Sequence, residues 1–237
     1  MMSRNCLDGG FFVTTQLALA AAAFAAMHLL ISGTRLRDAL VARLGEGRYR
    51  GLFSLASAVV LAWLIWAYAQ ARQPALTALT DWRWLGAALV LVSFLFIVLG
   101  LLTPGPTIVG AEKLLARGVE ARGIHRITRH PFLWGIALWA AVHMLFNPET
   151  VNLLFFGAFV LVAVAGTFSL DAKRARLFGE SWQRYAAQTS NLPFAAMLEG
   201  RNRLVPAELG WFKLVAAAAT YAAFALLHAR FFALPPF

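Results

Sequence analysis

The stretch Arg126–Asn147 reads R-I-T-R-H-P-F-L-W-G-I-A-L-W-A-A-V-H-M-L-F-N. From His130 onward it holds no Asp, Glu, Lys or Arg. Pro131 suits the first position of a helix, where its missing N–H is not needed. His130 then lies at the start of an apolar helix and His143 deep inside it, about 20 Å further along at 1.5 Å per residue. A neutral imidazole inside hydrocarbon needs a polar partner, so these histidines are the first candidate site residues.

Composition places the chain in a membrane. Its 237 residues are 60% hydrophobic and only 14% charged, whereas an average soluble domain is about 25% charged. Long uncharged runs predict an all-α, polytopic membrane protein whose first partner is the lipid bilayer. The one cysteine, Cys6, excludes an internal disulfide and a cysteine-cluster metal site.

Six apolar runs are long enough to cross, or nearly cross, about 30 Å of hydrocarbon. We expect one transmembrane domain over residues 1–237, with spans near 11–32, 52–71, 84–102, 130–146, 151–170 and 214–228. The fourth and sixth spans are short. A tight turn containing Pro148 should make the fourth and fifth spans an antiparallel hairpin.

The basic residues mark the topology. Seventeen of the 21 lysines and arginines fall in three alternate loops, residues 33–51, 103–129 and 171–213. The positive-inside rule places these loops in the cytoplasm and both termini outside. The net charge of +10 then reflects topology signals and contact with anionic lipids, and we expect no nucleic-acid binding.

The segment after the fifth span, residues 171–198, is amphipathic. Leu177, Trp182 and Tyr185 recur near helical spacing among lysines and arginines. Gly179 weakens this helix midway, because glycine is a poor helix former. We expect an interfacial segment that lies over the cytoplasmic mouth of the bundle.

Two histidines on different spans are candidates for a cofactor site. His28 lies about one turn inside the end of the first span, and His143 lies in the fourth. Each alone is as well explained by a hydrogen-bonded helix contact, although ionisable groups within spans tend to be functional. Two neutral imidazoles without an intramembrane carboxylate or thiol match the axial ligands of haem b, whereas zinc takes three or four protein ligands. The predicted depths differ by on the order of 10 Å, so His28 with His130 stays open as the alternative pair.

The residues before the fourth span form a second candidate site. Arg126, Arg129 and His130 at a helix N-terminus suit a carboxylate such as a haem propionate, although an ordinary basic flank has the same composition. Asp171 either caps the amphipathic segment and pairs with a neighbouring cation, or contacts a bound molecule at the mouth. His125, in the same basic loop, is expected to be solvated.

These motifs together resemble the NnrU family of bacterial membrane proteins. The resemblance rests on R-H-P-F-L-W-G-I-A-L-W-A-A-V-H-M, on L-R-D-A-L after His28, and on D-A-K-R-A-R-L-F-G-E-S-W from Asp171. It covers most of the chain, from Leu17 to Arg203. It implies a multi-pass protein of the bacterial inner membrane with a role in nitrite and nitric oxide metabolism during denitrification.

NnrU proteins are similar to the plastid 15-cis-zeta-carotene isomerases, which are haem b enzymes. In their motif a second histidine also follows His-Pro thirteen residues on. The resemblance implies that His28 and His143 ligate the iron of haem b. The isomerases carry a cysteine three residues before that second histidine, where this chain has Ala140, so a thiolate ligand switch is not implied here.

A more distant likeness is to the isoprenylcysteine carboxyl methyltransferases. They share R-H-P at a helix start and an acidic residue before F-G-x-x-[WY]-x-x-Y, here Asp171 before Phe178–Tyr185. In that family these elements hold S-adenosylmethionine at the cytoplasmic mouth. This chain has aspartate where glutamate is usual, and it carries His28 and His143, which a methyltransferase does not need.

Three functions remain as hypotheses from the sequence. The first is a haem b protein that isomerises a double bond of an apolar substrate or acts on nitrogen oxides, with His28 and His143 on the iron. The second is methyl transfer from S-adenosylmethionine to a small thiol or lipid-soluble acceptor. The third is a non-enzymatic accessory factor for denitrification, in which the histidines are structural.

Overall fold

The computed structural model describes residues 4–32, 34–71, 82–107 and 113–232. These residues form helices and connecting turns, with no strand among them. The helices are α1 Arg4–Leu30, α2 Arg35–Leu44, α3 Glu46–Ala71, α4 Arg83–Leu102, α5 Lys113–Ala116, α6 Pro131–Phe146, α7 Thr150–Gln188, α8 Ala195–Leu198 and α9 Trp211–Phe232, with 3-10 turns η2 Gly123–Arg126 and η3 Pro206–Leu209.

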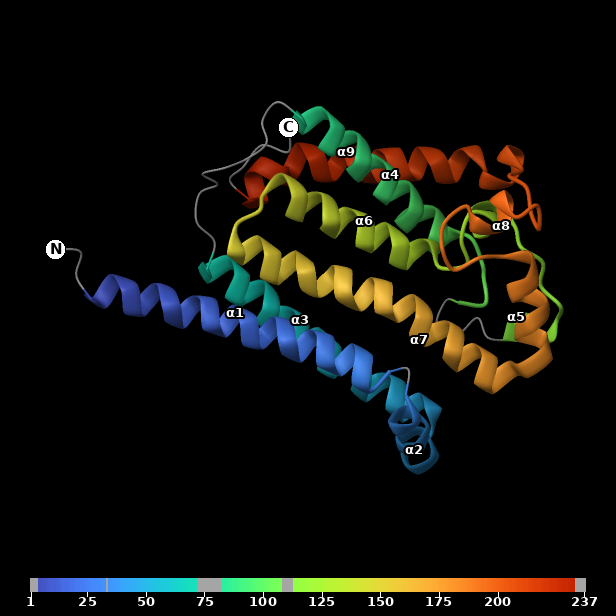
Figure 1. Cartoon of the computed structure of the whole chain (residues 1–237), viewed down its shortest axis with the longest axis horizontal. Helices are drawn as coiled ribbons and strands as arrows, with labels where there is room; N and C mark the ends of the chain where they lie inside the picture. Colours follow the sequence, from blue (N-terminus) through green and yellow to red (C-terminus); the bar gives the residue numbers. More distant parts are fainter. Residues whose placement is uncertain (1–3, 33, 72–81, 108–112, 233–237) are drawn as a thin grey trace.

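The long helices pack side by side in a row (Figure 1). The pair α1 and α3 packs on α7, α7 packs on α6, α6 packs on α4, and α4 packs on α9. The short elements α2, α5 and α8 gather at one end of this bundle (Figure 1). The three basic loops therefore lie at the same end, and the predicted α6–α7 hairpin is confirmed.

Helix length and hydropathy confirm an all-α polytopic membrane protein. Five helices are long and apolar enough to cross a membrane: α1, α3, α4, α7 and α9. The fourth predicted span, α6, has 16 residues, or about 24 Å, which is less than the hydrocarbon thickness of about 30 Å. The last span is longer than predicted, because α9 runs over 22 residues from Trp211 to Phe232.

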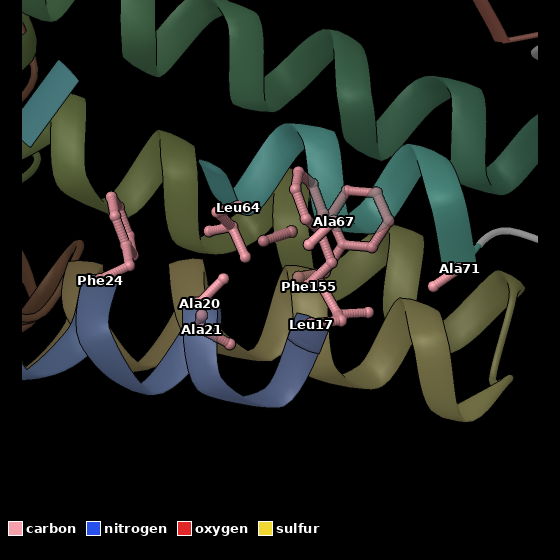
Figure 2. Packing of buried hydrophobic residues seen from close by; sticks show 11 residues of the cluster. Leu17, Ala20, Ala21, Phe24, Leu64, Ala67, Ala71 and Phe155 are labelled. Atoms are coloured by element: carbon pink, nitrogen blue, oxygen red, sulfur yellow. The ribbon is translucent and has the colours of Figure 1, made fainter. Parts of the chain in front are cut away.

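Small and aromatic side chains join α1 to its neighbours. Leu17, Ala20 and Phe24 of α1 face α3 and α7, where Leu64 and Phe155 meet them (Figure 2). Alanine lets helix backbones approach closely, which favours association where lipid gives no hydrophobic driving force. The Ala-rich run of the first span thus becomes the α1–α3–α7 contact.

Two glycines set the contact between α4 and α6. A Cβ at Gly135 would lie 2.8 Å from the carbonyl oxygen of Ser93, and a Cβ at Gly100 would lie 2.8 Å from the backbone nitrogen of Phe132. Both are closer than side chains approach a backbone. The N-terminal half of α6 is therefore pressed against α4, which fixes the position of the residues that precede it.

The amphipathic segment is helical, as predicted, and it is interrupted at Gly179. The backbone of Gly179 is non-helical, with φ 47° and ψ −122°, so α7 consists of two helices that meet at a kink there. Trp182 and Tyr185 are buried against Leu115 of α5. The rings of Trp182 and Tyr185 therefore pack against protein, whereas Leu177 of the same segment is exposed.

Candidate functional site

The start of α6 brings a histidine and an aspartate together. Pro131 is the first residue of α6 and His130 is its N-cap, while Asp171 lies on α7. His130 Nε2 is 2.6 Å from Asp171 Oδ1, and His130 is only 2% exposed. Because an ionised carboxylate only accepts hydrogen bonds, Nε2 carries the hydrogen and donates it.

The second oxygen of Asp171 has two further donors. Arg129 Nε lies 3.1 Å from Asp171 Oδ2 and Asn191 Nδ2 lies 2.9 Å from it. Arg129 also donates to backbone carbonyls at the end of α7, and its guanidinium carbon lies 5.6 Å from the ring centroid of Trp182. We call Arg129, His130, Asp171 and Asn191 the mouth cluster.

The loop after α7 is fixed to the start of α6 by its backbone. The carbonyl oxygen of Asn191 accepts from Thr128 Oγ1 at 2.5 Å and from Trp134 Nε1 at 2.8 Å. The N–H of Arg129 donates to the carbonyl of Ser190 at 2.9 Å. The mouth cluster is therefore held on both sides by hydrogen bonds to the main chain.

Three buried polar atoms beside this cluster have no hydrogen-bond partner among the described residues. They are His130 Nδ1, Tyr185 Oη and Asn191 Oδ1. Buried polar atoms are nearly always hydrogen-bonded, so such atoms mark a place for water or a ligand. With its hydrogen on Nε2, His130 offers Nδ1 as an acceptor or base.

Arg126 does not join the mouth cluster. Its guanidinium forms a bidentate pair with Glu208, at 2.7 and 2.9 Å, and donates to Asn202 at 3.1 Å. The hydrogen bonds from Arg126 and from the Gly123 N–H lower the pKa of Glu208 to about 2. The cradle of Arg126, Arg129 and His130 expected from the sequence is thus divided between two carboxylates.

His125 is buried, and the expectation that it is solvated is wrong. It is 1% exposed, and Nε2 lies 3.1 Å from the carbonyl oxygen of Thr103. Its ring occupies the place that a Cβ at Gly105 would need. Burial lowers the pKa of His125 below its usual 6.5.

The two intramembrane histidines share one arrangement. His28 Nδ1 lies 2.8 Å from the carbonyl oxygen of Phe24, and His143 Nδ1 lies 2.7 Å from that of Trp139. Each therefore donates from Nδ1 to the preceding turn of its own helix, and Nε2 keeps its lone pair. Ser57 Oγ lies 3.2 Å from His28 Nε2, whereas no described residue hydrogen-bonds His143 Nε2.

The structure does not bring His28 and His143 together. Phe24 and Trp139 both contact Phe159, with ring centroids 5.1 and 5.7 Å away. From that level His28 lies one turn toward α2, and His143 lies one turn toward the opposite end, because α1 and α6 run in opposite directions (Figure 1). The two imidazoles are therefore offset by about two turns, about 11 Å.

Sequence reasoning placed three of the four residues of the mouth cluster among its candidates. It missed Asn191, along with Ser57 and Glu208, because their partners lie far away in the sequence and no motif marks them. Among the described residues, no group of three or more His, Cys, Asp or Glu side chains is arranged to hold a metal ion.

Comparison with known proteins gives one family and two named relatives. The family model "NnrU protein" matches residues 16–236. The chain is 35% identical over 82 residues to the chloroplastic 15-cis-zeta-carotene isomerase of Arabidopsis thaliana and 32% identical over 82 residues to that of Zea mays. Each match covers 35% of this chain and 22% of the relative, so only a small part of the isomerases is represented. No solved structure matches.

The family match extends over almost the whole chain and includes His28 on α1, His130 and His143 at the start and within α6, and Asp171 on α7. The resemblance seen in the motifs is thereby confirmed at the level of the family. The chain belongs to the NnrU family.

Proposed function

We propose that this multi-pass membrane protein binds haem b within the bilayer and isomerises a double bond of an apolar substrate. The names of the two relatives support an isomerase, and the family match includes the positions of His28 and His143. Chemistry on nitrite or nitric oxide remains the alternative reaction for the same haem. The proposed location is the bacterial inner membrane, with the basic α2, α5 and α8 end in the cytoplasm.

The observation that best supports haem binding is the tautomer of the two intramembrane histidines. Iron takes a neutral imidazole through the nitrogen that bears the lone pair, and the other nitrogen is fixed by donating to a carbonyl or carboxylate. His28 and His143 both have this form, with Nδ1 bonded to a backbone carbonyl. The donor chemistry therefore fits axial ligation by either residue.

Because the two imidazoles are offset by about 11 Å, His28 and His143 are not equally placed to bind one iron. A single iron binds both imidazoles only if α1 and α6 slide relative to one another. His143 is the ligand that needs no rearrangement of its partners, whereas His28 must first release Ser57. We infer that His143 is the first ligand and His28 the second.

The remaining residues around His143 would bind and shield an apolar substrate. Bound haem supplies a redox-active iron that can weaken a conjugated double bond. The rings of Trp139 and Phe156 lie 5.0 and 4.7 Å from the His143 ring, centroid to centroid, and Phe159 extends this surface. These side chains exclude water and give a conjugated chain flat apolar contacts.

Absorption spectra of the detergent-purified protein test the proposal. We expect a Soret band, a b-type reduced spectrum and a pyridine haemochrome near one haem per chain. His143→Ala should abolish the band, His28→Ala should shift it, and His125→Gln, in the loop before α6, should leave it unchanged. A colourless protein from haem-replete cells would overturn haem binding, and unchanged spectra in the first two variants would overturn the ligand assignment.

The mouth cluster supports a second candidate, a methyltransferase that uses S-adenosylmethionine. Arg129, His130 and Asp171 converge as the distant likeness implies, and unpartnered buried atoms lie beside them. Saturable binding of S-adenosylmethionine by the purified protein, lost in Asp171→Asn and kept in His143→Ala, would favour this function. If the purified protein binds neither haem nor S-adenosylmethionine, the remaining hypothesis is the non-enzymatic accessory role.

A further inference from the structure

Large apolar side chains project from the chain between α7 and α9, outside the apolar part of any span. Leu192 is 53% exposed and Leu198 on α8 is 87% exposed. That value exceeds the 83% of Leu226, which lies on the span α9. An exposed apolar cluster outside the spans indicates a surface that binds something.

The backbone holds this surface in a conformation that the sequence does not favour. Phe194 has φ 67° and is the one described non-glycine residue with positive φ. Its N–H donates to the carbonyl of Ile127 at 2.8 Å, and its side chain is 46% exposed. A bulky residue in the left-handed region points to a functional constraint on where the side chain goes.

A cationic cleft adjoins α8. Its volume is about 320 Å³, and its lining includes Arg126, Arg201 and Arg203 but no acidic residue. The N–H of Arg201 donates to the carbonyl of Ala196 in α8 at 2.9 Å, so the cleft and the apolar surface are parts of one structure. Arg126 and Arg201 pair with Glu208 and Glu199. The exposed guanidinium of Arg203 has no partner among the described contacts.

The position of α8 relates this surface to the bilayer. The span α9 starts at Trp211 and Phe212, which are 77% and 66% exposed, and aromatic residues at a span end lie at the level of the lipid headgroups. Leu204, between the cleft and α9, is also exposed. The apolar surface and the cleft directly precede this end of α9 in the sequence, and we infer that they lie at the same headgroup level.

We propose that the cleft and α8 together bind an anionic phospholipid. The guanidinium of Arg203 takes the phosphate, because its planar N–H donors match phosphate oxygens, while Arg126 and Arg201 stay paired with Glu208 and Glu199. Leu192, Phe194 and Leu198 contact the upper acyl chains. A zwitterionic lipid brings its own cation toward the exposed Arg203 and binds less well. The site depends on neither haem nor S-adenosylmethionine.

Fluorescence quenching by spin-labelled lipid tests this site. A Cys6→Ser background removes the one native cysteine, and Leu198→Cys then carries an environment-sensitive fluorophore in phosphatidylcholine nanodiscs. A small, equal fraction of spin-labelled phosphatidylglycerol or phosphatidylcholine is added. Leu226→Cys on α9 is the matched position for bulk lipid. We expect the glycerol lipid to quench the fluorophore at position 198 severalfold more effectively than the choline lipid, and both to quench position 226 equally.

Charge variants locate the headgroup. Arg203→Ala should lower the preference at position 198 by about fivefold, as expected for the loss of one cation beside an anionic surface. Arg48→Ala, which removes an exposed arginine at the same end of the bundle, should leave the preference unchanged. Equal quenching by both lipids at 198, or no quenching by either, overturns the proposal. Loss of the preference in excess inorganic phosphate, but not in chloride of equal ionic strength, would assign the cleft to a small anion and also overturn it.

Discussion

The histidines at the two ends of α6 have opposite environments, one charged and one apolar. At the N-terminal end, His130 donates to Asp171, and the same carboxylate binds Arg129 and Asn191. Near the C-terminal end, His143 donates only to a carbonyl of its own helix and otherwise contacts aromatic rings. In the first arrangement, hydrogen bonds to one carboxylate hold the start of α6, the helix α7 and the loop after α7 together. The second keeps one nitrogen available, which is what an incoming ligand needs.

The largest expected effect comes from breaking the charged end. Asp171→Ala leaves His130 and Arg129 without their acceptor in a largely buried site, and we expect a loss of about 3 kcal/mol in the free energy of unfolding. Thermal unfolding in detergent measures it. Asp38→Ala is the matched control, because Asp38 pairs with Arg37 and Arg176 at a more exposed site and should cost about 1 kcal/mol or less. Equal losses in the two variants would contradict this account of the mouth cluster.

The next largest expected effect is a loss of stability at low pH, and it comes from His125, a buried histidine outside the membrane spans. His125 is buried, and its Nε2 donates to the Thr103 carbonyl; burial lowers its pKa below 6.5, and the nearby His130 and Lys213 lower it further. The unfolded chain then binds a proton more readily than the folded chain as pH falls below 6.5. Stability should therefore drop, by no more than about 1.4 kcal/mol per pH unit.

Unfolding midpoints at pH 7.5 and 5.5 test the role of His125. His125→Gln keeps a donor for the Thr103 carbonyl but does not titrate, so its midpoint should depend less on pH than that of the unchanged chain. An identical pH dependence in both proteins would show that His125 is not the titrating group.

The smallest effect comes from making His28 resemble His143. Ser57→Ala removes the hydroxyl at His28 Nε2, and we expect a loss of about 1 kcal/mol or less in stability. In a haem-bearing preparation the Soret band should shift, because a free Nε2 competes better for the iron. A stability loss of more than about 2 kcal/mol would assign that hydrogen bond to the packing of α1 on α3 rather than to a site.

Hydropathy predicted the spans because each apolar run is local in the sequence. It could not predict that Trp182 and Tyr185 are buried, since the partner that covers them is Leu115, some seventy residues earlier. The burial of His125 was missed for a similar reason. The space for its ring exists only because Gly105, on another segment, has no Cβ.

The candidate site residues show the same contrast between what a local motif predicts and what a distant partner decides. The motif around His130 and the acidic residue after the fifth span predicted the centre of the mouth cluster. Arg126 was assigned to the same place because it is close in sequence, but its carboxylate partner is Glu208, 82 residues away. Ion-pair partners at such separations leave no periodic signal, so only the fold reveals how neighbouring arginines are shared out.

The shortness of α6 also makes the protein sensitive to the membrane around it. A helix of about 24 Å meets a hydrocarbon layer of about 30 Å, and such hydrophobic mismatch is relieved by local thinning of the bilayer or by tilting of neighbouring helices. The ends of α6 are where that deformation acts, and those ends hold His130 and His143. Bilayer thickness is thus a physical variable coupled to both candidate sites at once.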